Sequence, residues 1–416
     1  MEARTRVGKR YGMEARNKRI LMSRMPRPHF LVLGLQRLVE RVEMSNDKYY
    51  PGLEGVIAGE TAVSTVDGGL LYRGYPIEDL AADASFLEVA YLLLHGELPT
   101  QERLADFQSV LAESAEVPAP IVTLLGDIPV HAGAMDVLRT GVSALAHFDP
   151  QADENTREAN VAKATRLLAQ IPILIATRYR QTKGLPLIEP NPELSFSANI
   201  LHMITGREPS SAQERAMEVS LILYAEHEFN ASTFTSRVVT STMSDLYSAI
   251  TAAIGALKGP LHGGANERVM EVLEEVGTPD RAEAWVREAF AEKRRIMGFG
   301  HRVYKTGDPR AKILREYCQQ LSGQTGGTAL ERIADTIEEI VSSEKGLPPN
   351  LDWPSARLYN YLGLEVELYT PLFVASRVLG WSAHVIEQSE NNRLIRPRSK
   401  YSGPERRPFK SLAQRG

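Results

Sequence analysis

Most of the chain carries apolar residues at the i, i+3 and i+4 spacing of amphipathic helices, with short Gly- or Pro-containing breaks between them. Two stretches, 211–224 and 244–257, are the most apolar, so we expect them near the centre of the fold. The pattern predicts helices over residues 86–95, 101–114, 135–147, 155–180, 192–204, 211–224, 244–257, 267–276, 281–297, 309–321, 329–343, 355–362 and 372–386.

One stretch, residues 54–75, has the pattern of β-structure. Its small and apolar residues flank Asp67-Gly68-Gly69, a turn sequence of the type that closes a hairpin. The sequence therefore predicts an all-α protein, mainly helical, with a small N-terminal β-hairpin.

The composition changes near Gly263, after which the segments carry more charge and shorter apolar faces. This change favours a smaller helical domain inserted into a larger one. We expect residues 51–263 to form the first part of the large domain and 264–363 the small domain. Residues 364–416 would complete the large domain and end in a basic tail.

Composition narrows the class of protein. The 416 residues carry 48 Lys and Arg against 52 Asp and Glu, and a net charge of −4 gives no general attraction to nucleic acid. The one cysteine, Cys318, excludes an intramolecular disulfide and a cysteine-based zinc cluster, and favours a reducing cytoplasm. No apolar run reaches the ~18 residues of a membrane span.

The N-terminal segment differs from the rest, since residues 1–43 hold eleven Lys and Arg and four Glu. We expect residues 1–50 to be a basic extension with no function of its own. Three interpretations stay open: a start at Met44, a dispensable tail, and a mitochondrial-type presequence. Nucleic-acid binding by residues 1–43 would disappear in a chain that starts at Met44.

Three of the nine histidines lie at breaks between predicted helices: His227, His262 and His301. Glycines beside His262 and His301 would let backbone N–H groups approach a ligand. Taken singly, each is more often an ordinary hydrogen-bonded loop residue. Their spacings contain no His-x-x-x-His pair, so we expect no metal.

Three other charged residues are candidates for the site, and two of them, Arg377 and Asp352, have two interpretations each. Arg377 is the one cation within the apolar stretch 372–386, so it is either in an internal salt bridge or an anchor for a carboxylate. Asp352 lies between prolines and Trp353, so it is either a helix N-cap or a partly desolvated base. Arg310 follows Pro309 at a predicted helix start.

Together these residues carry a resemblance to the citrate synthase family. The stretch GFGHRVYKTGDPR (298–310) resembles the signature segment of that family, and GPLHGGANE (259–267) resembles one of its histidine segments. The other similar segments, in the family's order, are YRGYPIEDLA (72–81), HEFNASTFTSRV (227–238), NLDW (350–353), TPLFVASRVLGW (370–381) and RLIRPRSKY (393–401).

The resemblance covers about 51–405 and implies a helical, dimeric enzyme with its active site between a large and an inserted small domain. Such enzymes condense an acyl-CoA with oxaloacetate and hydrolyse the CoA ester. The resemblance implies that Asp352 removes the α-proton, His262 donates to the thioester oxygen, and His301 polarises and protonates the ketone.

The resemblance also implies residues that hold the substrates. Oxaloacetate would be held by His227, Asn230, Arg310 and Arg377, with Arg396 reaching the neighbouring subunit's site in a homodimer. Lys305, Met297, Gly298 and Gly300 would bind CoA. Acetyl-CoA or propionyl-CoA would be a co-substrate, with no permanently bound cofactor, no metal, no nucleic acid and no membrane.

The acyl group is the open point. Trp353-Pro354 departs from the aromatic pair that follows the catalytic Asp in many family members, and a Trp there also resembles some 2-methylcitrate synthases. We favour citrate synthase, at the entry to the tricarboxylic acid cycle, over 2-methylcitrate synthase. An inactive CoA-binding scaffold is the remaining alternative, and the complete set of site residues argues against it.

Overall fold

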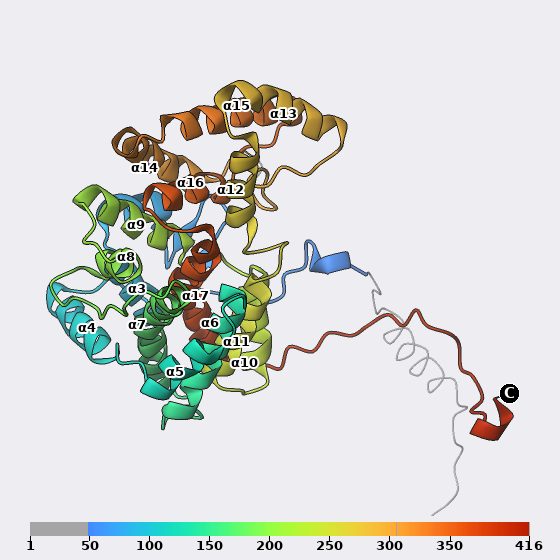
Figure 1. The fold of residues 1–416 in the computed structure, drawn as a ribbon. Helices are drawn as coiled ribbons and strands as arrows, with labels where there is room; N and C mark the ends of the chain where they lie inside the picture. The colour runs from blue at the N-terminus through green and yellow to red at the C-terminus, as the bar shows by residue number, and fades with distance from the viewer. Residues whose placement is uncertain (1–48, 305, 416) are drawn as a thin grey trace, which may run out of the picture. The chain divides into compact units, whose positions relative to one another are not determined.

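The computed structural model describes residues 49–304 and 306–415 and confirms the predicted mainly helical fold (Figure 1). Its described part holds sixteen α-helices and one small sheet. The helices are α2 (Ile77–Asp83), α3 (Phe86–His95), α4 (Gln101–Glu113), α5 (Ala119–Asp127), α6 (Ala134–Leu145), α7 (Arg157–Thr182), α8 (Phe196–Thr205), α9 (Ser211–Tyr224), α10 (Ala231–Ser241), α11 (Leu246–Leu257), α12 (Ala265–Val276), α13 (Pro279–Ala291), α14 (Pro309–Thr325), α15 (Thr328–Lys345), α16 (Asp352–Tyr361) and α17 (Tyr369–Glu390).

The sheet is smaller than the predicted β region. Its antiparallel strands run in the order β1 (Ser64–Thr65), β2 (Leu71–Tyr72), β3 (Tyr75–Pro76). The predicted turn joins β1 and β2, with positive φ at both of its glycines. Residues 54–62 form no strand, and at the end of this stretch the Ala62 N–H donates to a side chain, Glu387 Oε1, at 2.7 Å.

Local signals explain why the ends of some helices match the prediction. Helix α3 begins after Ser85, whose side chain forms a capping box with Glu88, and ends at Gly96 with φ of 94°. Helix α9 begins after a second capping box, between Ser210 and Gln213. Such caps satisfy the backbone groups that a helix end leaves unpaired.

The prediction of a helix over 281–297 is wrong at its C-terminal end. Helix α13 ends at Ala291, because Lys293 takes a left-handed φ of 56° and the Arg294 N–H donates back to the Ala289 carbonyl. At α16 the prediction starts three residues late. Pro354 lies in the first turn of that helix, where no backbone N–H is needed.

Three helices were not predicted: α2, α5 and α10. Helices α2 and α5 are short, and α10 is rich in β-branched residues, which weakens its propensity. Packing against α11 and α17 compensates for the weak helix propensity of α10. Asn230 caps its N-terminus by accepting from the Thr233 N–H.

The described chain falls into two units, residues 59–398 and the two terminal segments. The described parts of the terminal unit, 49–58 and 399–415, are exposed and contain two short 3-10 helices, η1 (Pro51–Leu53) and η4 (Leu412–Gln414). In the larger unit, α17 is buried along almost its whole length and packs against α7, α10 and α11. No helix among the described residues is long and apolar enough to span a membrane.

Helices α12 to α16 lie together at one side of the larger unit (Figure 1), with α13 packed on α15, and α14 and α12 on α16. This group spans residues 265–361, close to the predicted small domain. The division into a large and a small domain stays a prediction.

Candidate active site

The three histidines lie in loops between helices, as predicted. His227 lies between α9 and α10, His262 between α11 and α12, and His301 between α13 and α14. A histidine in such a loop is fixed by the helices on each side and keeps its imidazole available for chemistry.

His227 and His301 lie together around Tyr304. Their ring centroids are 5.2 Å apart, and His227 Nε2 is 3.1 Å from the Tyr304 hydroxyl oxygen. The ring of Tyr304 is 4.7 Å from that of His301. Burial, followed by the charges of Arg310 and Arg377, holds the pKa of His227 well below its usual range. His227 is therefore a neutral side chain at physiological pH.

Backbone hydrogen bonds fix the tautomer of His301. Its Nδ1 accepts from the N–H groups of Val303 at 3.1 Å and Tyr304 at 3.2 Å. A ring nitrogen that accepts carries no proton, so the proton of the neutral ring lies on Nε2. His301 thus offers an N–H donor at Nε2.

Arg310 is the second residue of α14 and is buried. Its Nε and Nη2 donate to the two carboxylate oxygens of Asp308, at 3.0 and 2.8 Å. Asp308 Oδ2 also accepts from the Leu351 N–H at 3.2 Å. One carboxylate therefore joins the arginine to the loop that carries Asp352.

Arg377 on α17 is buried but has no ion pair within 4 Å among the described residues. Its Nε donates to the Tyr224 carbonyl at 2.6 Å, and its guanidinium lies 4.7 Å from the ring centroid of Phe373. Burial lowers its pKa to about 10, so it stays charged at neutral pH. The structure thus favours the carboxylate anchor over the internal salt bridge.

The His262 ring is held by Ser232 at the start of α10. Nε2 accepts from the Ser232 N–H at 3.3 Å and lies 2.7 Å from Ser232 Oγ, and that oxygen accepts from Trp381 Nε1 at 3.1 Å. The proton of the neutral ring therefore lies on Nδ1. Burial, with a smaller effect of Arg377, lowers the pKa of His262 to about 4, so the ring is neutral at physiological pH.

Asp352 is the first residue of α16 and not its N-cap, because Leu351 occupies that position. Its Oδ1 accepts from the Tyr224 hydroxyl at 3.0 Å. Burial raises the pKa of Asp352 to about 6, against opposing effects of Tyr224, Arg310 and Arg377. A carboxyl with this pKa is mainly ionised at pH 7 and still basic enough to take a proton.

Two of the predicted CoA-binding residues lie beside the loop that precedes Asp352. The Gly300 N–H donates to the Pro348 carbonyl, and the Asn350 N–H to the Gly298 carbonyl, at 2.8 and 2.9 Å. Gly298 has φ of 87°, and a Cβ there would come within 3 Å of Val269 and Trp353. Met297 is half-buried next to Gly298. Lys305 lies outside the described residues.

The other two predicted residues have different surroundings. Asn230 uses its side chain within the protein: Oδ1 accepts from Thr233 N–H, and Nδ2 donates to Thr233 Oγ1 at 3.0 Å. Arg396 follows α17 and is exposed. Their contacts with substrate stay predictions.

Sequence reasoning missed the polar side chains that support the site: Tyr224, Ser232, Tyr304 and Asp308. Tyr304 and Asp308 lie within the quoted segment 298–310, so a search of that segment for supporting groups could have found them. Tyr224 gave no signal, since its partner Asp352 is 128 residues away.

Among the described residues, no three His, Cys, Asp or Glu side chains form a group that could hold a metal ion. The fold and the site define a helical protein with a half-buried carboxyl of raised pKa, neutral imidazoles and buried arginines. Such a set fits proton transfer on a substrate that carries carboxylates.

Comparisons with known proteins show which family this chain belongs to. A sequence family described as "Citrate synthase, C-terminal domain" matches residues 52–398, and the chain belongs to the citrate synthase family. It is 48% identical to "Citrate synthase 2" of Bacillus subtilis over 88% of this chain and 98% of that protein. It is 46% identical to "2-methylcitrate synthase" of Mycobacterium tuberculosis over 86% of this chain and 91% of that protein.

A solved structure is also similar. The citrate synthase of the archaeon Thermoplasma acidophilum, in a ternary complex with carboxymethyl coenzyme A and oxaloacetate, aligns with a TM-score of 0.84 at 35% identity. The alignment covers 88% of this chain and 100% of that one.

Proposed function

We propose that this protein is a citrate synthase, which condenses acetyl-CoA with oxaloacetate and hydrolyses citryl-CoA to citrate and CoA. The observation that carries the proposal is Asp352, a half-buried carboxyl that accepts from Tyr224 and has a pKa of about 6, in the same site as two buried arginines. The α-proton of a thioester is very weakly acidic, so its removal needs a poised base and a donor that stabilises the enolate.

Each residue has a proposed role in the first step. Asp352 takes the α-proton from the acyl group. His262 donates from Nδ1 to the thioester oxygen, where negative charge develops. It donates as a neutral imidazole, because its pKa is about 4. No hydrogen bond joins Nδ1 to any described residue, which leaves this N–H for the substrate.

Oxaloacetate, the second substrate, is held by the arginines and by the remaining histidines of the site. Arg310 and Arg377 pair with the carboxylates of oxaloacetate, and His227 and Asn230 bind its other oxygens. His301 Nε2 donates to the ketone oxygen and protonates it as the new carbon–carbon bond forms. Two arginines that are charged at neutral pH fix the orientation of the ketone for attack by the enolate.

CoA would lie along the loop of Met297, Gly298 and Gly300, and Lys305 is a further predicted CoA-binding residue. Gly298 and Gly300 contact the loop that leads to Asp352, so a ligand there would be next to the base. We infer closure of the 264–363 domain over the substrates, which would exclude water until condensation is complete. We place the reaction in the cytoplasm.

The function is tested by thiol release from acetyl-CoA and from propionyl-CoA, each with oxaloacetate. We expect a higher kcat/KM with acetyl-CoA. A propionyl preference of roughly tenfold or more would establish a 2-methylcitrate synthase, since one methylene supplies about that much discrimination. Relatives with both names support testing the two in parallel. No thiol release from folded protein would favour the scaffold alternative.

We further propose a homodimer in which Arg396 completes the site of the partner. We expect Arg396→Ala to stay dimeric and to raise KM for oxaloacetate by roughly tenfold, the value of one charged hydrogen bond. Kinetics and sedimentation would measure the two effects. Arg393→Ala, a neighbouring exposed arginine, is the matched control. Unchanged kinetics of the Arg396 variant would refute the contribution in trans.

A further inference from the structure

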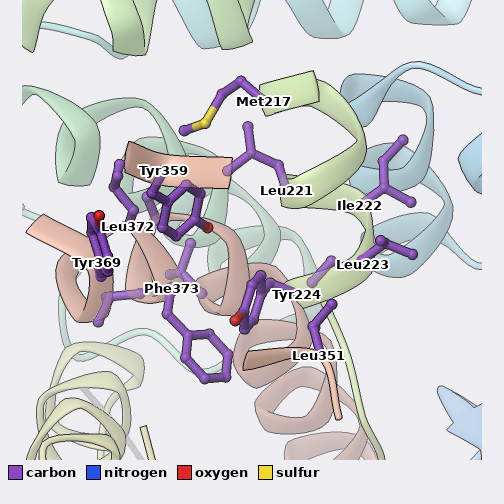
Figure 2. Close-up of a cluster of buried hydrophobic side chains, with 14 of the residues drawn as sticks. Met217, Leu221, Ile222, Leu223, Tyr224, Leu351, Tyr359, Tyr369, Leu372 and Phe373 are labelled. Atoms are coloured by element: carbon purple, nitrogen blue, oxygen red, sulfur yellow. The ribbon is translucent and has the colours of Figure 1, made fainter. Parts of the chain in front are cut away.

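The base has a buried partner with no role in the steps above. Tyr224 ends α9, is 2% exposed, and places its hydroxyl between the side chains of Asp352 and Ser355. The hydroxyl oxygen is 3.0 Å from Asp352 Oδ1 and 2.7 Å from Ser355 Oγ. Figure 2 shows the ring of Tyr224 beside that of Phe373.

The direction of these hydrogen bonds follows from the charge of Asp352. An ionised carboxylate only accepts, so Tyr224 donates its one proton to Oδ1. Ser355 Oγ then donates either to the Tyr224 oxygen or to the Asp352 carbonyl at 3.2 Å. No hydrogen bond joins Oδ2 to a described residue, so this oxygen is left to take the substrate proton.

We propose that Tyr224 is a positioning residue for the base: its hydroxyl fixes Oδ1, stabilises the ionised carboxylate and directs Oδ2 to the acyl group. The proposal rests on the proposed function, because it assigns the proton transfer to Asp352. A donor held in this way keeps one oxygen of the base in place and costs no reorganisation during the reaction.

The electrostatics agree with this geometry. Burial raises the pKa of Asp352, and the hydrogen bond from Tyr224 is the largest of the effects that lower it. Burial and the charge of Asp352 raise the pKa of Tyr224 well above its usual range, so the phenol stays a donor. The charged groups that face Asp352 are Asp308 and Arg310, at the start of α14, and Arg377 on α17.

Tyr224 must be changed without loss of its backbone or ring. Its carbonyl accepts from Arg377 Nε at 2.6 Å, and its ring centroid is 4.3 Å from that of Phe373. Tyr224→Phe removes the hydroxyl alone. Tyr359→Phe is the matched control, because Tyr359 is equally buried and its hydroxyl contacts Ser220 at 2.9 Å and not Asp352.

The first readout is the pH profile of kcat/KM. Without the phenol the pKa of Asp352 rises further, so the acid limb of Tyr224→Phe should move to higher pH. We expect a shift of roughly one unit, since a hydrogen bond to a charged group is worth about that much. KM for oxaloacetate should stay the same, and Tyr359→Phe should keep the wild-type profile. A uniform loss at every pH would overturn the proposal.

The second readout needs no substrate, so it separates failure of this proposal from failure of the proposed function. The hydroxyl stabilises the ionised form of Asp352, so the difference in Tm between wild type and Tyr224→Phe should grow as pH rises through about 6. In an Asp352→Asn background that pH dependence should vanish. If it persists, or is absent in the wild-type background, Tyr224 does not act on the ionised carboxylate.

Discussion

Asp352→Asn should lower kcat for thiol release by roughly 10²–10⁴-fold, the usual contribution of a positioned general base. The amide has nearly the same shape, and its oxygen can still accept from Tyr224, so the site keeps its geometry. It cannot take a proton from the acyl group. KM for oxaloacetate should change little, because Arg310 and Arg377 are untouched. Steady-state kinetics with each substrate varied would measure both effects.

The pH profile of wild-type kcat/KM also tests whether Asp352 is the base. Asp352 acts in its ionised form, so kcat/KM should fall as pH decreases through about 6. Glu218→Gln is the matched control, since burial also raises the pKa of that carboxyl and it binds Phe86 N–H outside the site. Lost oxaloacetate binding in Asp352→Asn, with turnover retained at saturation, would give Asp352 a binding role in place of the base.

The sequence predicts helices best where local and tertiary forces agree. Helix α9 has a capping box at its start and an apolar pattern throughout, and its predicted bounds match. Helix α10 was missed because β-branched residues favour other local structure, and only packing on α11 and α17 stabilises it. The end of α13 depends on a left-handed lysine, for which no residue preference gives a signal.

In the site, too, some residues could be predicted from the sequence and others only from the fold. His227, His262 and His301 could be selected from breaks in the helical pattern, and their roles came from resemblance. The two interpretations of Arg377 could not be separated in sequence, because the choice depends on whether a carboxylate lies within reach in the folded chain. Ser232 was missed for the same reason: it is 30 residues from His262, and only the fold brings them together.

His262→Ala should lower kcat by roughly 10²–10³-fold, the cost of removing one donor from an oxyanion site. The ring acts as a neutral donor from Nδ1, because Nε2 already accepts from the Ser232 N–H. Its pKa of about 4 means that activity near neutral pH should not follow its titration. His202→Ala, which removes a half-buried histidine on α8, is the control that should keep wild-type kcat.

The double variant Asp352→Asn, His262→Ala decides whether the two residues serve one step. If Asp352 removes the proton while His262 stabilises the enolate that forms, neither helps much without the other. The double variant should then lose little more than the worse single variant, in place of the product of both losses. Fully multiplicative losses would place the two residues in separate steps, with His262 acting on the ketone or on hydrolysis of the CoA ester.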